Sequence, residues 1–265
     1  MFISLIFQID MIYFITYFDK RVIYMEIKIF KTAEEIGAAV AKIFTDEVKK
    51  NPSCVLGLAT GATPIPTYKN IIATYEKGGI SFKDVKTYNL DEYCNLPKSD
   101  KNSYYTFMHE QLFNGLDILE ENVHFLNGNA EDCEAECKRY DDEINNAGGI
   151  DIQLLGIGNN AHIGFNEPAD EFTNGSFKVQ LTESTINANK IYFDENPMPT
   201  HALTMGVKQI MSAKKIILIA TGPKKAEAIK NMVEGPVTAQ VPASILQEHQ
   251  DAVIFLDEAA ASLLK

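Results

Sequence analysis

The sequence carries few positive charges for its size. Lysine and arginine number 24 against 36 aspartate and glutamate residues, which gives a net charge of −12 over 265 residues. Because affinity for nucleic acid is mostly electrostatic, this balance argues against a broad surface for the phosphate backbone and against a nucleic-acid partner. A small anionic substrate stays open, since a local site can be basic on an acidic protein.

Cysteine is also scarce, with four residues and no CxxC pair. Cys133 and Cys137 are four residues apart and could share one helix face, but two ligands do not make a zinc site. Dispersed free thiols are typical of a reducing compartment. We therefore expect a cytoplasmic protein without a structural metal.

The first 24 residues lack the features of a targeting segment. The apolar stretch MFISLIFQIDMIYFITYF has no cationic start and no small-residue cleavage site, and Asp10 interrupts it. It is therefore a poor signal peptide and a poor membrane span. Met25 opens a clean strand, and Thr32 to Glu35 form a capping box at the start of a helix. We expect residues 1–24 to be an upstream translation artefact or a disordered extension, with no membrane partner.

No repeat, low-complexity tract or linker divides the remaining chain, so we expect one domain over residues 25–265. Short apolar runs alternate with amphipathic stretches, which predicts βαβ units in an α/β fold. The expected strands are 26–30, 54–58, 85–90, 152–157, 215–220 and 252–256, and the expected helices are 33–50, 65–77, 103–114, 130–146, 205–212, 223–233 and 258–264. Several strands are continuous runs of valine, isoleucine and leucine, as expected of strands buried on both faces. This pattern predicts an open, mostly parallel sheet with helices on both faces.

Residues 169–200 differ from the rest of the chain. They show no strong period and carry turn signals at Asn174-Gly175 and Asn196-Pro197. A segment of this kind directly after a catalytic loop suits a lid. An ordinary surface excursion is the alternative.

Residues 56–66, LGLATGATPIP, place glycine and threonine where a buried strand ends and a helix begins. Backbone N–H groups in such a turn form an anion site, with the hydroxyls of Thr60 and Thr63 as further donors. The P-loop lysine and the GxGxxG spacing are both missing, so a nucleotide is poorly supported. A tight turn that simply needs Gly61 is the alternative.

Residues 88–93, YNLDEY, place two adjacent carboxylates at another strand end. Successive strand side chains point to opposite faces, so Asp91 and Glu92 cannot both address one site. One of them can act as a base in a cleft while the other is a structural partner. A cap for the following helix is the alternative.

Residues 154–168, LLGIGNNAHIGFNEP, form a third strand end, with His162 and Glu167 five residues apart. A carboxylate that fixes the tautomer of an imidazole makes a proton-transfer pair. A metal site is less attractive, because no further histidine or cysteine completes the shell. A structural, buried histidine is the remaining alternative.

A fourth strand end, residues 219–225, IATGPKK, leads into a helix that begins with Lys224 and Lys225. Cations at a helix N-terminus are unfavourable for the helix dipole. A lysine there is well explained by an anion that it meets, and solvated lysines are the alternative.

Taken in order, these segments resemble the glucosamine-6-phosphate deaminase family, also called glucosamine-6-phosphate isomerase. The matching stretches are LGLATGATPIPTY, YNLDEY, NSYYTFM, LLGIGNNAHIGFNEP and ALTMGV, over about residues 25–265. The resemblance implies a Rossmann-like α/β fold and a hydrolase that acts on a C–N bond without metal or cofactor. It implies the conversion of glucosamine 6-phosphate and water into fructose 6-phosphate and ammonia, in N-acetylglucosamine degradation. The implied partner is a small sugar phosphate, and the implied state is a monomer or homo-oligomer.

The same resemblance gives roles to individual residues. Asp91 matches the base that moves the C2 proton, and His162 matches the group that opens the sugar ring, with Glu167 as its partner. Asn160 cannot relay a proton, so we expect it to orient His162 by a hydrogen bond. The expected phosphate cradle consists of Thr60, Gly61, Ala62, Thr63 and Lys225.

Three positions depart from the family pattern. Ala62 stands where glycine or serine is usual, and Ala161 replaces a glycine just before His162. In the stretch NANKIYFD, the family often has an arginine that grips phosphate, whereas this sequence has Ile191. The adjacent Lys190 is a further candidate for the phosphate site, although a lysine is a point charge and not a bidentate fork. Residues for allosteric activation are not evident around 177–182, so we expect no activation by the acetylated sugar phosphate.

Three other functions compete with this one. A 6-phosphogluconolactonase shares the fold and a GH-containing segment, but usually lacks the NEP glutamate and has a DER-like motif where DEY stands here. A deaminase for galactosamine 6-phosphate differs only in the orientation of one substrate hydroxyl. A sugar-phosphate effector domain of a transcription regulator needs a helix-turn-helix, which residues 1–24 are too short and too apolar to supply.

Overall fold

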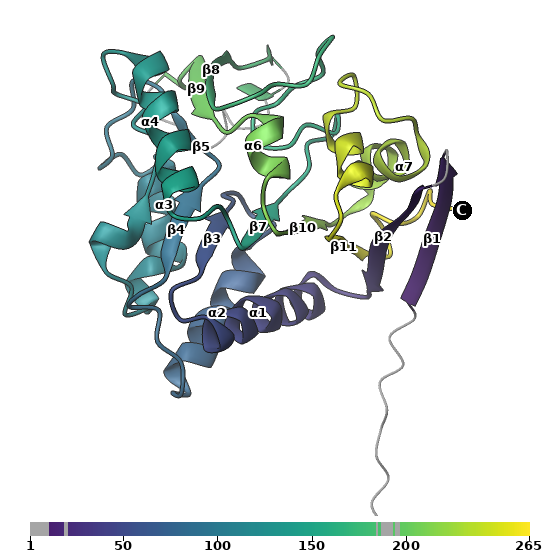
Figure 1. The fold of residues 1–265 in the computed structure, drawn as a ribbon, viewed down its shortest axis with the longest axis horizontal. Helices are drawn as coiled ribbons and strands as arrows, with labels where there is room; N and C mark the ends of the chain where they lie inside the picture. Colours follow the sequence, from purple (N-terminus) through teal and green to yellow (C-terminus); the bar gives the residue numbers. More distant parts are fainter. Residues whose placement is uncertain (1–10, 19–20, 184, 187–192, 194–196) are drawn as a thin grey trace, which may run out of the picture.

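A twisted sheet of eight strands runs through the computed structural model, which describes residues 11–18, 21–183, 185–186, 193 and 197–265, with side chains from Met25 onward (Figure 1). The strand order is β1-β2-β11-β10-β7-β3-β4-β6, and every neighbouring pair in it is parallel except β1 and β2. The strands are β1 (Met11–Phe18), β2 (Arg21–Phe30), β3 (Val55–Leu58), β4 (Lys86–Asn89), β6 (Val123–His124), β7 (Ile152–Leu155), β10 (Lys215–Ala220) and β11 (Ala252–Asp257). The central strands β3 and β7 are buried along their whole length, as expected of mainly apolar strands, and β7 also buries the polar side chain of Gln153.

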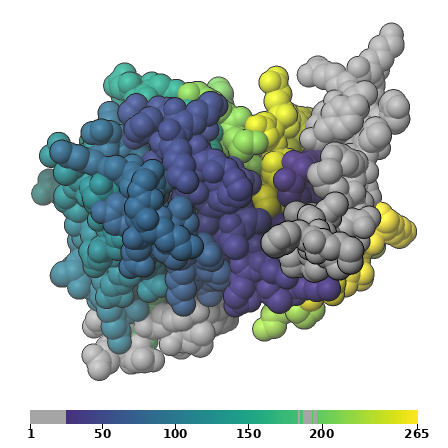
Figure 2. All heavy atoms as spheres, turned by 90° about the horizontal axis from the view of Figure 1, so that it is seen from below, coloured from purple at the N-terminus to yellow at the C-terminus, as the bar shows by residue number. Residues whose placement is uncertain are grey.

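Helices cover both faces of this sheet. They are α1 (Ala33–Lys50), α2 (Ile65–Glu76), α3 (Tyr104–Gln111), α4 (Cys133–Asn146), α6 (Val207–Met211) and α7 (Ala226–Glu234). The helix α1 begins at the predicted capping box, in which Thr32 and Glu35 bond to each other's backbone N–H groups. In Figure 1, α1 and α2 lie along one face while α6 and α7 lie on the other, and Figure 2 shows the surface on the α1 and α2 side.

The order of the strands opens a crevice at one edge of the sheet. From β3 the chain crosses through α2 to β4, whereas from the neighbouring strand β7 it crosses through α6 to β10 on the other side. Because such crossovers are right-handed, the two connections lie on opposite faces. Their loops part at the carboxyl ends of β3 and β7, which is where open α/β sheets bind ligands.

A second, smaller sheet stands beside this crevice. It consists of β5 (Asp91–Tyr93), β9 (His201–Thr204) and β8 (Phe177–Gln180), paired antiparallel in the order β5-β9-β8. Asp91 pairs with Thr204 in this register, so the chain that follows β4 is held in place by its pairing with β9. The small sheet has its own apolar cluster, formed by Tyr93, Leu96, Phe165, Leu181, Phe193 and Ala202.

The predicted open, mostly parallel sheet is confirmed, and each of the six expected strands has a counterpart in it. Five strands of the described residues were not predicted: β1, which lies in the expected extension, and β5, β6, β8 and β9, which have two to four residues each, too few to show a period. The expected helix at 258–264 was wrong, because residues 258–263 form turns. Among the described residues, no helix is long and apolar enough to cross a membrane.

The N-terminal segment differs from the expectation in one respect. The expected first strand began at Glu26, whereas β2 begins at Arg21 and pairs antiparallel with β1. Residues 11–18 and 21–24 of the expected extension are therefore strand, and β1 forms an edge of the large sheet. That residues 1–24 are an upstream translation artefact stays a prediction.

Candidate active site

Four strand ends that are far apart in the sequence converge on one cavity of about 760 Å³. The loops after β3, β4 and β7 line it, together with Lys225 from the segment after β10 and residues from the approach to α3. The predicted site residues that line it are Thr60, Gly61, Ala62, Thr63, Asp91, Asn160, His162 and Lys225. The carboxyl edge of the sheet thus brings together the four segments that the sequence singled out.

The loop after β3 has the geometry of an anion site. Gly61 has a φ of +99°, a conformation that residues with a side chain rarely adopt. The turn therefore needs a glycine at this position, as predicted. The N-terminus of α2 lines the cavity, and no side chain of the described residues caps it. The positive end of this helix therefore faces the cavity. The buried hydroxyl of Tyr68 donates to the carbonyl of Ala59 and ties the loop back to its own helix.

Lys225 supplies a cation to the same cavity. It ends the short helical turn Pro223–Lys225 before α7, and burial lowers the pKa of its ammonium group. No carboxylate among the described residues lies within ion-pairing distance of it, which leaves the charge available to a ligand. Asp257 accepts two hydrogen bonds from the backbone N–H of Gly222, at 3.0 and 2.8 Å, and holds the loop in place. Lys224 is exposed and does not line the cavity, so the solvated alternative holds for that residue.

The two adjacent carboxylates point in different directions, as the strand alternation predicts. Asp91 lines the cavity although only 7% of it is exposed, and burial together with the charge of Glu92 raises its pKa to about 8. Glu92 points away and accepts the backbone N–H groups of Tyr93, Tyr104 and Tyr105 at 2.8, 3.0 and 2.9 Å. The last two open α3, so Glu92 caps that helix. The cap interpretation therefore applies to Glu92, whereas the role of Asp91 as a base stays a prediction.

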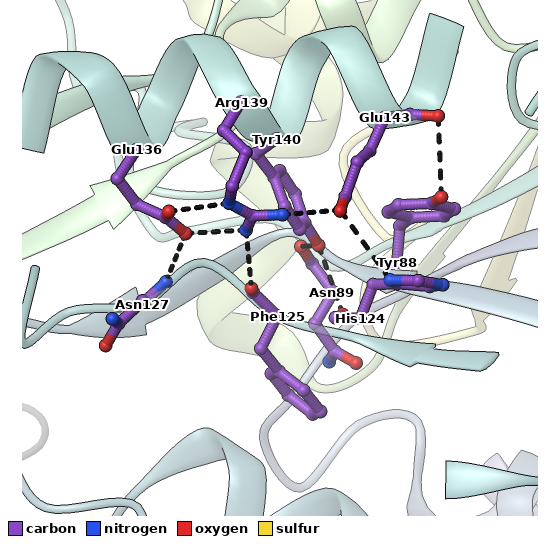
Figure 3. A network of polar contacts seen from close by, with 9 residues as sticks. All are labelled: Tyr88, Asn89, His124, Phe125, Asn127, Glu136, Arg139, Tyr140 and Glu143. Atoms are coloured by element: carbon purple, nitrogen blue, oxygen red, sulfur yellow. Dashed lines mark hydrogen bonds and ion pairs between the residues drawn. The ribbon is translucent and has the colours of Figure 1, made fainter. Parts of the chain in front are cut away.

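Side chains of α4 contact the end of β4, the strand that leads to Asp91 (Figure 3). The hydroxyl of Tyr140 donates to the carbonyl of Asn89 at 2.7 Å, and it lies fully buried against the end of β4. The neighbouring Arg139 pairs with two glutamates of the same helix, including Glu143 at 2.6 Å. These contacts fix the backbone two residues before the carboxylate in the cavity.

His162 and Glu167 meet across the loop after β7. The imidazole Nδ1 lies 3.4 Å from Glu167 Oε2, within ion-pairing range although not aligned for a hydrogen bond. Burial by itself raises the pKa of Glu167, but His162 and the hydrogen bonds from Thr185 and Asn160 outweigh it and lower the pKa to about 2. Glu167 is therefore ionised at neutral pH. A Cβ at Gly158 would overlap the imidazole ring, so this glycine makes the room in which the ring lies.

Asn160 contacts the pair in a different way from the one expected. Its Oδ1 accepts the backbone N–H of His162 at 3.3 Å, and its Nδ2 donates to Glu167 Oε2 at 2.6 Å. Asn160 thus holds the loop backbone and the carboxylate, and the imidazole is oriented through Glu167. Ala161, between them, has a φ of +66°, a conformation that costs about 1–2 kcal/mol for a residue with a side chain. A glycine, which is usual at this position, would adopt this conformation without that cost.

Several residues at the site were not predicted. Thr185 lines the cavity and donates to Glu167, and Thr182 lies beside it. Both belong to the stretch 169–200, where no period or motif marked single residues. Lys101 and Tyr104 also line the cavity. Tyr104 belongs to the matching stretch NSYYTFM, to whose residues the resemblance assigned no role. The candidate Lys190 and its neighbour Ile191 lie outside the described residues.

Comparisons with known proteins agree with this arrangement. A family model described as glucosamine-6-phosphate isomerases/6-phosphogluconolactonase matches residues 30–255. A glucosamine-6-phosphate deaminase of Lysinibacillus sphaericus (strain C3-41) is 52% identical over 225 residues, which are 84% of this chain and 95% of that protein. One of Thermoanaerobacter sp. (strain X514) is 48% identical over 241 residues, 91% of this chain and 95% of that protein. A solved structure described as a monomeric glucosamine-6-phosphate deaminase is similar with a TM-score of 0.87 and 43% identity, covering 90% of this chain and 100% of that one.

Proposed function

The chain belongs to the family of glucosamine-6-phosphate isomerases and 6-phosphogluconolactonases, and from this membership we propose that it catalyses the deamination of glucosamine 6-phosphate. The products are fructose 6-phosphate and ammonia, and the reaction serves the catabolism of amino sugars. The relatives at 48–52% identity carry the name of this activity. Within the structure, the observation that supports it is the meeting of a buried carboxylate, a histidine–carboxylate pair and a lysine without an ion pair among the described residues in one cavity.

The phosphate of the substrate binds where the loop after β3 enters α2. Helix N-termini and tight turns bind phosphate through their N–H groups, and the hydroxyls of Thr60 and Thr63 add donors. Lys225, which lines the same cavity, contributes a positive charge. A dianion also favours the charged form of this lysine, which burial disfavours in its absence.

The reaction begins when the sugar ring opens, and His162 carries the proton that this step moves. An imidazole whose Nδ1 faces an ionised carboxylate favours the tautomer with its proton on Nδ1, which leaves Nε2 to exchange a proton with the ring oxygen. Glu167 stays ionised and supplies that carboxylate. Asn160, which cannot carry a proton, keeps Glu167 in place.

Asp91 then moves a proton between two carbon atoms. Its carboxylate takes the proton from C2 of the open-chain sugar and returns it to C1, while a second proton moves from the amino nitrogen to O1, which leaves an imine at C2. Water adds to the imine, and ammonia leaves as the ketone forms. A pKa of about 8 makes the carboxylate of Asp91 a stronger base than an ordinary aspartate, and a base with a pKa near neutral pH both binds and releases a proton readily. The step shifts electrons within the substrate and needs no external oxidant, so we propose that no cofactor takes part.

The residues also distinguish this activity from its rivals. Glu167 of the NEP motif is present and paired with the histidine, and Tyr93 stands where the DER-like lactonase motif has an arginine. We propose the cytoplasm as the compartment, a small sugar phosphate as the partner, and a monomer or homo-oligomer as the state.

A coupled assay tests the proposal directly. Ammonia and fructose 6-phosphate are measured with glucosamine 6-phosphate and with galactosamine 6-phosphate, each with and without N-acetylglucosamine 6-phosphate. We expect equal amounts of both products from the first substrate and no activation by the acetylated sugar. Hydrolysis of 6-phosphogluconolactone without ammonia release from either amino sugar contradicts the proposal.

A further inference from the structure

Thr185 lies at the cavity wall with its hydroxyl on the carboxylate that faces the histidine. It is buried, with 6% of its surface exposed, and its Oγ1 donates to Glu167 Oε1 at 2.7 Å. Thr182 Oγ1 lies 3.0 Å from Thr185 Oγ1 and 3.2 Å from the same carboxylate oxygen. Two hydroxyls and one carboxylate therefore form a compact cluster behind the proposed ring-opening pair.

The direction of the hydrogen bonds follows from the number of protons. A threonine hydroxyl has one proton to donate and two lone pairs to accept with. An ionised carboxylate only accepts, so Thr185, the nearer of the two hydroxyls, donates to Glu167. Thr182 accepts the backbone N–H of Thr185 at 3.3 Å and donates toward Thr185 Oγ1. Hydrogen bonds that run in one direction strengthen each other, and this series ends on Glu167.

The cluster determines which oxygen of Glu167 faces the histidine. The Oε1 atom accepts from the hydroxyls, and the Oε2 atom accepts from Asn160 at 2.6 Å and lies 3.4 Å from His162 Nδ1. The last torsion of a glutamate is broad, so a carboxylate held at one oxygen can turn. Holding both oxygens keeps Oε2 against the imidazole.

We propose that Thr185 is a positioning residue for the ring-opening step, an inference that rests on the proposed function. Among the described residues its hydroxyl bonds to Glu167 and Thr182 and not to His162, so it acts by fixing Glu167, which in turn faces the imidazole. The stretch 169–200 thereby contributes to the acid–base chemistry by a residue that its sequence pattern did not mark.

Two substitutions distinguish the effect of the Thr185 hydroxyl from the effect of the side chain's shape. Thr185→Val keeps the branched side chain and removes the donor, whereas Thr185→Ser keeps the donor and removes a methyl group. The matched control is Thr74→Val, on α2, where the hydroxyl donates to the carbonyl of Asn70 at 2.8 Å and does not line the cavity. Thermal unfolding of all three variants first establishes that they are folded.

The steady-state assay measures ammonia release as kcat and KM, with inorganic phosphate as a competitive inhibitor. For Thr185→Val we expect kcat to fall about 10- to 100-fold, the effect of losing a hydrogen bond to a charged group, with unchanged KM and phosphate inhibition. We expect Thr185→Ser and the Thr74 control to keep most of the turnover. Wild-type kcat in Thr185→Val, or an equal loss in Thr185→Ser, overturns the inference.

A crystal structure of Thr185→Val supplies a reading that does not depend on activity. We expect Glu167 Oε2 to leave ion-pairing range of His162 Nδ1, and an unmoved carboxylate contradicts the inference. If the unsubstituted protein releases no ammonia, the proposed function fails, and this structure still decides whether Thr185 positions Glu167.

Discussion

Replacing Asp91 by asparagine is expected to abolish turnover and, at alkaline pH, to stabilise the fold. The substitution keeps the size of the side chain and removes its charge. As the proposed base, Asp91 has to take up a proton from carbon, which an amide cannot do. As a buried carboxylate beside Glu92, it is also a group whose ionisation the folded protein opposes.

The size of the stabilisation follows from the raised pKa. Folding raises the pKa of Asp91 from 3.8 to about 8, so the folded state binds this proton more tightly than the unfolded state. The free energy of unfolding is therefore highest below pH 3.8 and falls as pH rises toward 8, where the loss is complete. Each pKa unit corresponds to about 1.4 kcal/mol, so Asp91→Asn is expected to gain about 3–6 kcal/mol above pH 8 and nothing near pH 4.

Urea unfolding of both proteins at pH 4, 7 and 8.5, combined with the ammonia assay at each pH, measures this. Asp84→Asn, at an exposed carboxylate, is the matched control and is expected to change the unfolding free energy by less than about 0.5 kcal/mol at every pH. A stability difference for Asp91→Asn that is the same at pH 4 and pH 8.5 refutes the reasoning from burial. Wild-type ammonia release refutes the role of Asp91 as base.

Three further predictions concern the other parts of the cavity. Lys225→Met removes the cation of the proposed phosphate site, and we expect KM to rise about 10-fold or more with little change in kcat, measured by initial rates of ammonia release. Glu167 has its pKa lowered to about 2, so its stabilising contribution is present above its ordinary pKa of 4.5 and is lost as pH falls toward 2. We expect Glu167→Gln to remove about 1–2 kcal/mol of this acid dependence in urea unfolding, and an unchanged dependence contradicts the pairing. Gly158→Ala places a methyl group where the ring of His162 lies, so we expect a loss of kcat of about 10-fold or more with phosphate inhibition retained.

Much of the architecture can be predicted from local sequence. The strands β3, β7, β10 and β11 consist mainly of apolar residues, and the Thr32–Glu35 capping box opens α1 as expected. Both signals depend on neighbours in the chain, which is why they can be read without a structure. The short strands of the second sheet have no such signal, since β5 is defined by its pairing with β9, about 110 residues away in the sequence.

The same division applies to the site. By itself, the sequence determined that carboxylates, a histidine, a glycine turn and a lysine stand at four strand ends, and parallel strands bring such ends to one edge. It also determined that Asp91 and Glu92 point apart, because alternation is a property of the strand backbone. Which of the two faces the cavity was decided by the tertiary structure, since Glu92 is held by two N–H groups of α3, 12 and 13 residues away. The contact of Thr185 with Glu167 was likewise decided by folding, because a hydroxyl has no sequence signal until a distant acceptor lies within reach of its one proton.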